Sequence, residues 1–122
     1  MSAETRQAPP QPEISFEDFL RLDIRVGTIT RADVNEGARK PALRLWLDFG
    51  PVVGERQSSA QLAANYTPEE LIGRQVLAVV NFAPRRINGF RSDVLVLGVS
   101  DAAGEVVLIT PERAVPDGGR LY

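Results

Sequence analysis

The chain has 122 residues, of which 43% are hydrophobic and 25% charged, and its formal net charge at pH 7 is −2. This is the composition of one ordinary globular domain, and the slightly negative charge excludes a protein that coats nucleic acid through bulk electrostatics. The absence of cysteine and histidine excludes disulfides, thiol chemistry and the side chain that most often serves as general base, metal ligand or pH switch.

Residues 1–13 are polar and proline-rich and have little to bury, so we expect a flexible leader followed by one domain over residues 14–122. No stretch approaches 18 consecutive apolar residues, and no signal peptide opens the chain. We therefore expect a cytoplasmic protein that does not insert into a membrane.

A short helix is predicted next. Ser15 is a good N-cap, and acidic residues follow it in the first turn, where the helix dipole favours them. Phe16 and Phe19 fall on one side of this helix. A helix this short is marginal alone, so its aromatic face must dock on the chain's own barrel or on a second subunit.

The first two strands are predicted over residues 23–33 and 42–49. Gly27 interrupts the first, and a glycine inside a strand marks a bulge or a sharp coil that helps a small barrel to close. The second alternates between apolar and polar positions, which is typical of a half-buried antiparallel strand. Trp46 lies on its polar face, where packing under a loop or at a subunit contact is favoured over a base-stacking platform.

Four more strands and a second helix follow. A capping box, with Thr67 as N-cap, Pro68 as the first helical residue and Glu70 at the third, predicts a compact helix that stops at Gly73. The remaining chain, residues 111–122, looks extended and pinned to a surface. The further strands are predicted over residues 55–60, 75–82, 94–100 and 105–110.

Five or six short strands, with a capped helix between the third and the fourth, predict an all-β fold. We expect a five-stranded OB-fold barrel with a short N-terminal helix and a capped connecting helix. An SH3-like barrel is the alternative, but it does not usually place a helix in its longest connection.

A basic loop over residues 81–94 lies between two buried strands. It carries Arg85, Arg86 and Arg91, while Pro84 and Asn88-Gly89 favour a shaped loop with a tight turn at positive φ. Guanidinium groups suit phosphate oxygens and stack on bases. The alternative is a solvated β-turn whose arginines are incidental.

Ser58 and Ser59 invite an enzymatic interpretation, but the chain offers neither a histidine base nor a G-x-S-x-G elbow. Capping or phosphate contact is the better interpretation of these hydroxyls. We expect no catalytic residue, no metal site and no cofactor.

Several motifs resemble the tRNA-binding OB domain appended to methionyl-tRNA synthetases and to related synthetase cofactors. They are DIRVG (23–27), RQSSA (56–60), YTPEELIG (66–73) and VNFAPRRINGFRS (80–92). Others resemble the branch of free-standing CsaA-type secretion chaperones: FEDF (16–19), ARKPA (38–42), DFG (48–50) and SSAQ (58–61). The resemblance covers roughly residues 14–121.

The resemblance implies an OB-fold homodimer, joined through the N-terminal helix and the extended C-terminal segment of each chain. It implies that tRNA is bound by its shape on the barrel face and the basic loop. In the CsaA branch it also implies a chaperone in protein export, with unfolded precursor proteins and the export machinery as partners. The alternative is a tRNA-binding structural cofactor of an aminoacyl-tRNA synthetase without chaperone activity.

Site residues follow from the same resemblance, position by position. The implied RNA contacts are Arg56, Ser58, Asn81, Arg85, Arg86, Arg91 and Ser92. For a peptide-binding or dimer surface, the candidate residues are Phe16, Phe19, Trp46, Phe90 and Leu121. Many synthetase-type domains have Leu-Lys-Pro where this chain has Phe82-Ala83-Pro84, so it lacks one positive charge in the loop.

Overall fold

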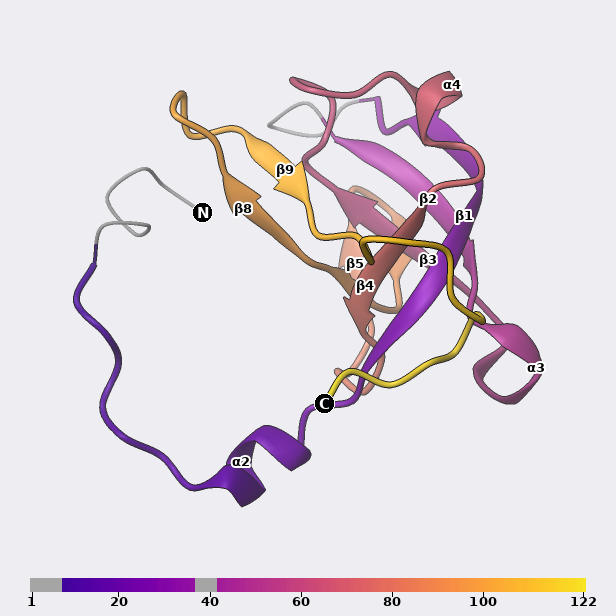
Figure 1. Ribbon diagram of the computed structural model, residues 1–122. Coiled ribbons are helices and arrows are strands. Elements are labelled where there is room, and N and C mark those ends of the chain that lie inside the picture. Colours follow the sequence, from indigo (N-terminus) through magenta and orange to yellow (C-terminus); the bar gives the residue numbers. More distant parts are fainter. Residues whose placement is uncertain (1–7, 37–41) are drawn as a thin grey trace.

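The computed structural model describes residues 8–36 and 42–122 (Figure 1). Residues 1–7 of the expected leader, and most of the ARKPA motif, lie outside the described residues. Residues 8–15 are exposed and form neither helix nor strand, and they lead into the first helix, α2 (Phe16–Leu20).

The centre of the fold is a five-stranded antiparallel sheet in the order β3-β2-β1-β4-β7. Its strands are β1 (Ile24–Val34), β2 (Leu43–Asp48), β3 (Glu55–Ala60), β4 (Gln75–Val79) and β7 (Leu95–Val96). Two hairpins extend it, β5 (Arg85–Ile87) with β6 (Phe90–Ser92), and β8 (Gly98–Ser100) with β9 (Val106–Leu108).

The sheet curls until its first and last strands meet, which makes a nearly closed barrel. Asp93 N donates to Gln57 O at 2.8 Å, and Ser58 Oγ donates to Val94 O at 2.8 Å, so β3 is joined to the segment that leads into β7. This confirms the predicted OB-fold barrel. No helix in the described part of the chain is both long enough and apolar enough to cross a membrane.

The alternating pattern of the second strand builds the core. Leu43, Leu45, Leu47 and Phe49 are each at most 1% exposed. Burying a side chain of this size contributes about 1.5–3 kcal/mol relative to leaving it in water, so this one strand anchors the barrel.

Gly27 has a different role from the bulge expected of it. The register between β1 and β2 shifts between Ile29 and Arg31, three residues further along the strand. At Gly27 itself, an added Cβ would lie 2.6 Å from the ring of Phe49. The glycine therefore makes room for the largest side chain of the core.

Both predicted helix caps are present. At α2, Asp18 N donates to Ser15 Oγ and Ser15 N donates to Asp18 Oδ2, each at 3.3 Å. At α4 (Pro68–Leu71), Thr67 N donates to Glu70 Oε1 at 3.2 Å. A further short helix, α3 (Gly50–Val53), connects β2 to β3.

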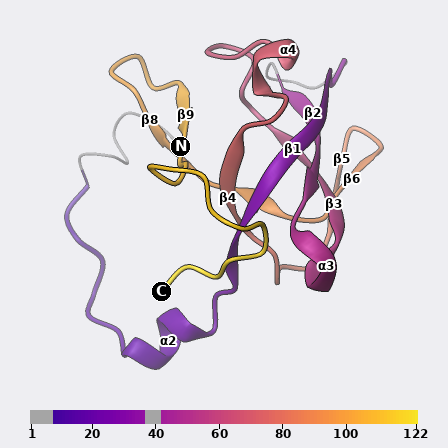
Figure 2. The same ribbon diagram turned by 45° about the vertical axis from the view of Figure 1, so that its right-hand side comes forward.

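The C-terminal segment lies along β1, as expected of a segment pinned to a surface. Gly118 N donates to Val26 O and Leu121 N donates to Ile24 O, both at 2.8 Å. Arg120 Nη2 reaches Leu20 O at 2.6 Å, which ties this segment to the end of α2. Apart from this tie, α2 projects from the barrel, and none of its residues is buried (Figures 1 and 2).

Candidate nucleic-acid interface

The basic loop folds into the β5–β6 hairpin, whose turn is Asn88-Gly89. Asn88 has φ 51° and Gly89 has φ 77°, as a two-residue hairpin turn of this type requires. Asn88 Nδ2 also donates to Glu36 O at 2.6 Å, which holds the tip of the hairpin against the end of β1. The predicted tight turn is confirmed.

Pairing within the hairpin decides which way its arginines face. Arg86 is opposite Arg91, while Arg85 is opposite Ser92. Because successive side chains of a strand alternate between faces, Arg86 and Arg91 share the outward face and Arg85 lies on the other. All three are exposed, whereas Ser92 is buried.

Several hydrogen bonds fasten this hairpin and the residues after it to β3. Gln57 Nε2 donates to Arg91 O at 2.7 Å, and Ser59 N donates to Ser92 Oγ at 3.1 Å. The contacts of Gln57 and Ser58 that close the barrel are two more. The hairpin is therefore a fixed feature of the surface.

Two of the RNA contacts predicted from the sequence, Ser58 and Ser92, take part in the hydrogen bonds between the hairpin segment and β3. Ser58 is 1% exposed and Ser92 is 9% exposed, and the hydroxyls of the two lie 3.5 Å apart. A direct contact of either hydroxyl with RNA would require the hairpin to leave β3. The structure gives both side chains a positioning role.

The charges of the hairpin are only partly compensated. Among the described residues, Arg85 and Arg86 make no ion pair, and Arg86 Nη1 donates to Gly89 O at 3.4 Å. Arg91 Nε lies 2.7 Å from Asp93 Oδ1, an ion pair without the alignment of a hydrogen bond, and the Arg91 side chain remains 60% exposed. Positive potential therefore gathers here on a slightly acidic chain.

Two further arginines, which the sequence did not single out, adjoin the hairpin. The Arg31 guanidinium lies 4.4 Å from the centre of the Trp46 ring, and that of Arg44 lies 5.0 Å from the Phe90 ring. Trp46 and Phe90 meet edge to face with ring centres 5.5 Å apart. Trp46 thus packs under the hairpin, as the loop-packing interpretation expected. The alternation that places Arg44 on the polar face with Trp46 could have indicated this cluster.

The two remaining predicted RNA contacts lie away from the turn. Asn81 Nδ2 donates to Arg21 O at 2.7 Å and Asn81 Oδ1 accepts from Asp23 N at 3.0 Å, so it fastens the segment after α2 to the end of β4. Arg56 is half-buried in β3, and its guanidinium donates to Glu55 O at 3.1 Å.

The residues predicted for a peptide or dimer surface divide into two groups. Trp46 and Phe90 pack under the hairpin, as described. Phe16, Phe19 and Leu121 belong to the two terminal segments, with the Phe16 and Phe19 rings 6.1 Å apart and Leu121 bonded through its N–H to β1. Phe16 is 69% exposed and Leu121 39%.

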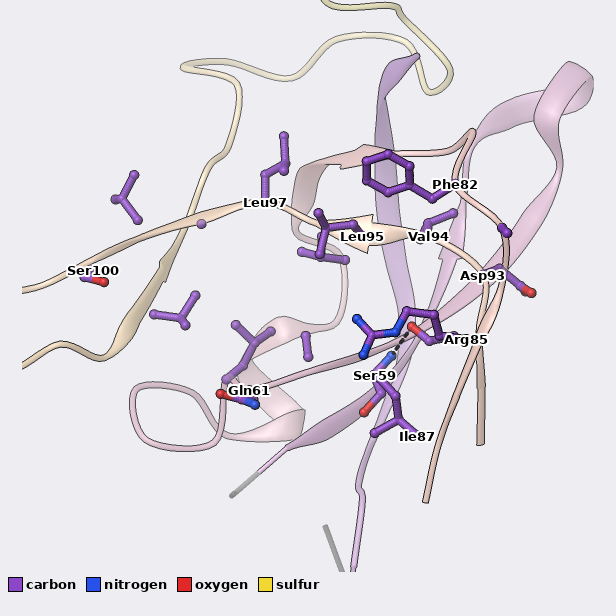
Figure 3. Close-up of a pocket in the computed structure, with 18 residues that line it drawn as sticks. Ser59, Gln61, Phe82, Arg85, Ile87, Asp93, Val94, Leu95, Leu97 and Ser100 are labelled. Carbon is purple, nitrogen blue, oxygen red and sulfur yellow. Dashed lines mark hydrogen bonds between the residues drawn. The ribbon is translucent and has the colours of Figure 1, made fainter. Parts of the chain in front are cut away.

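An apolar groove of about 600 Å3 opens beside the hairpin, where β3 ends and diverges from β7 and β8 (Figure 3). Phe82, Leu95 and Val99 line it and are 49–51% exposed. Arg85 and Ile87 line it from the inner face of the hairpin. No sequence pattern indicated this groove, because it arises from the incomplete closure of the barrel.

The described residues hold no group of acidic side chains that could bind a metal ion. One carboxyl group whose pKa is shifted is that of Asp23. A hydrogen bond from the Arg25 guanidinium lowers the pKa of Asp23 below its ordinary value, with burial opposing this and the charges of Arg25 and Arg120 supporting it. This network lies at the start of β1 and supports the chain termini.

Comparison with solved structures gives close matches over most of the chain. The chaperone CsaA from Bacillus anthracis str. Ames is 51% identical with a TM-score of 0.85, and the match covers 91% of this chain and 100% of that one. The CsaA chaperone protein from Picrophilus torridus is 43% identical with a TM-score of 0.83, over 90% and 100% of the two chains.

Among curated proteins, the methionine–tRNA ligase of Porphyromonas gingivalis strain ATCC 33277 is 39% identical over 98% of this chain. The chain spans only 17% of the length of that relative. The sequence also matches, over residues 24–120, the family described as "Putative tRNA binding domain". With this match over the whole barrel, the chain belongs to that tRNA-binding domain family.

Proposed function

We propose that this protein binds tRNA in the cytoplasm, through the β5–β6 hairpin and the adjoining outer face of β1 and β2. The observation that carries the proposal is the exposed pair Arg86 and Arg91 on one face of a hairpin that is fastened to the barrel. The function is binding and not catalysis, since the family is defined by a tRNA-binding domain.

A fixed array of guanidinium groups suits an RNA that is recognised by its shape. Each guanidinium presents a planar fork to phosphate oxygens, and little conformational freedom is lost when its support is already rigid. Arg31 and Arg44 extend the array beyond the hairpin, each held against an aromatic ring. Phosphates at fixed spacing along a folded RNA can therefore meet several arginines at once.

The test is binding of bulk tRNA across a salt series, with the double variant Arg85→Ala/Arg86→Ala. We expect weaker binding and a flatter dependence on salt, because fewer counterions are released when fewer phosphates are neutralised. The control is Arg113→Ala, a surface arginine that is 80% exposed and paired with Glu112 outside the hairpin. Unchanged affinity of the double variant at every salt concentration would refute the site.

A second function, as a chaperone that holds unfolded precursor proteins for the export machinery, is favoured by the apolar groove. Exposed apolar surface of this kind binds extended polypeptide segments. The related structures named CsaA chaperone cover nine-tenths of this chain. The alternative is a protein whose groove binds no polypeptide, which would act as a tRNA-binding structural cofactor of an aminoacyl-tRNA synthetase.

The chaperone function is tested by suppression of aggregation of an unfolded precursor protein. We expect Val99→Asp, on the groove wall, to reduce suppression, and Val52→Asp, which is 88% exposed on α3, to leave it unchanged. Equal suppression by both variants would place the polypeptide site elsewhere. No suppression by the unchanged protein would favour the cofactor function.

We also propose a homodimer joined through the terminal segments. The α2 helix buries none of its residues within its own chain, and Ile14 and Phe16 are 70% and 69% exposed. A second copy would cover this apolar surface together with Leu121. Light scattering on the unchanged protein and on Phe16→Ser tests the dimer, which the substitution should weaken.

A further inference from the structure

We infer that tRNA and a polypeptide exclude each other on one barrel, because both ligands use Arg85. The inference rests on the two functions proposed above and concerns how they are regulated. The two sites are not separate surfaces: the groove and the basic array share one edge, which is strand β5.

Strand β5 serves the two sites with its opposite faces. Arg86 lies on the outward face with its partner Arg91, whereas Arg85 and Ile87 lie on the face that lines the groove. Figure 3 shows the Arg85 and Ile87 side chains together at the groove, with the Ser59–Ser92 hydrogen bond beside them. A phosphate that binds Arg85 would therefore lie at the mouth of the groove.

The groove favours one class of occupant, an extended apolar segment with a carboxylate. Most of its wall is apolar, from Phe82 across to Val99. Among the described lining residues Arg85 is the only cation, and Asp93, the only acid, is already paired with Arg91. In a segment with a glutamate or aspartate flanked by apolar residues, the apolar side chains would pack on the groove wall and the carboxylate would pair with the Arg85 guanidinium.

The hairpin cannot relieve this competition by moving away while it stays bonded to β3. Ser59 N holds Ser92 Oγ, and Gln57 Nε2 holds Arg91 O. One guanidinium therefore faces two anionic partners, an RNA phosphate and a peptide carboxylate. Coupling of this kind is reciprocal, so each ligand must weaken the other by the same factor.

The experiment measures the Kd of a fluorescent synthetic peptide, apolar with one central glutamate, in the absence and presence of bulk tRNA. For ligands that exclude each other, the apparent Kd of the peptide rises about elevenfold when free tRNA is at about ten times its own Kd. The matched peptide with glutamine in place of glutamate should bind less tightly and show a smaller rise.

Two variants separate the shared residue from its neighbours. In Arg86→Gln, tRNA binds less tightly, but at the same multiple of its new Kd it should still raise the peptide Kd by the same factor. In Arg85→Gln, both ligands should bind, each more weakly, and the rise should largely disappear. Undiminished exclusion in Arg85→Gln would overturn the inference.

The same experiment distinguishes a failure of this inference from a failure of the two proposed functions on which it rests. If each ligand binds alone and the peptide Kd does not respond to tRNA, the sharing of Arg85 is wrong while both proposed functions stand. If the peptide does not bind at all, the polypeptide function fails and the inference fails with it. If tRNA does not bind, the first proposed function is the one refuted.

Discussion

Arg86 and Arg91 are direct cross-strand partners on the outward face of the β5–β6 hairpin. Like charges directly opposite one another destabilise a strand pair, typically by a fraction of a kcal/mol. Asp93 offsets part of this repulsion through its ion pair with Arg91. A bound polyanion would neutralise the remaining repulsion between the two guanidinium groups. The hairpin should therefore be more stable in a complex with a polyanion than alone.

The first prediction concerns this pair. We expect Arg86→Gln to weaken tRNA binding by about 5–30-fold and to reduce the slope of log K against log salt by about 0.7–0.9. Because the repulsion is lost, the free energy of unfolding should stay the same or rise by about 0.2–1 kcal/mol. Filter binding at several salt concentrations measures the change in tRNA affinity, and urea unfolding measures the change in stability. A loss of stability would contradict the repulsion argument.

The second prediction uses the only tryptophan of the chain, Trp46. Arg31 lies over its ring, so a tRNA that binds Arg31 should change the emission of Trp46. In Arg31→Gln we expect a smaller change on titration and a loss of about 0.5–1 kcal/mol of stability. The loss comes mainly from the cation–π contact, because the ion pair of Arg31 with Asp33 at 2.8 Å is exposed and contributes little. Arg21→Gln, at the end of α2, is the control. Equal responses in both variants would place the RNA elsewhere.

The third prediction tests the fit of Gly27 against Phe49. A Cβ at this position would lie 2.6 Å from the ring, so Gly27→Ala should destabilise the barrel by about 1–3 kcal/mol through overpacking. At Gly119 the nearest atom to an added Cβ is 3.5 Å away, so Gly119→Ala should be nearly neutral. Urea midpoints of the two variants give the comparison. A neutral Gly27→Ala would show that Phe49 is free to move aside.

The fourth prediction concerns pH. The pKa of Asp23 is lowered when the chain folds, chiefly by the hydrogen bond from Arg25, so its stabilising effect is fully present above the ordinary value of 3.8. It is lost as the pH falls through the lowered pKa, because the unfolded chain then binds more protons. Asp23→Asn should therefore be less stable than the unchanged protein at pH 7, and this difference should shrink in strong acid. Urea unfolding of the two proteins between pH 7 and strong acid gives the comparison, and a difference that stays constant over this range would contradict the prediction.

Local patterns predicted much of the fold because each pattern had a local cause. Alternation located the second strand, the N-cap Ser15 with the acidic residues after it located α2, and a capping box located α4. The strand predicted over residues 94–100 is instead two strands, β7 and β8. Its middle residue, Leu97, donates to Leu77 O and accepts from Ile109 N. Those partners are fixed only when the barrel has formed, so no local pattern could have shown the division.

The candidate site was less predictable than the fold, for the same reason. The hairpin arginines could be identified from their density in the chain, but the burial of Ser58 and Ser92 depends on β3 and β6 meeting across the barrel. Arg31 and Arg44 join the surface only because Phe90 folds over Trp46. The groove depends on where two distant strands diverge.

The bond between Gly118 and Val26 sets an order of events for the newly made chain. Residues of β1 are synthesised early, yet one of their edges stays open until the C-terminal segment has left the ribosome. The five strands of the sheet are all made by residue 96, but the edge of β1 at Ile24 and Val26 is covered only when residues 118–121 have been added. A nascent chain stalled before that point would present this strand edge to any other unfolded protein nearby.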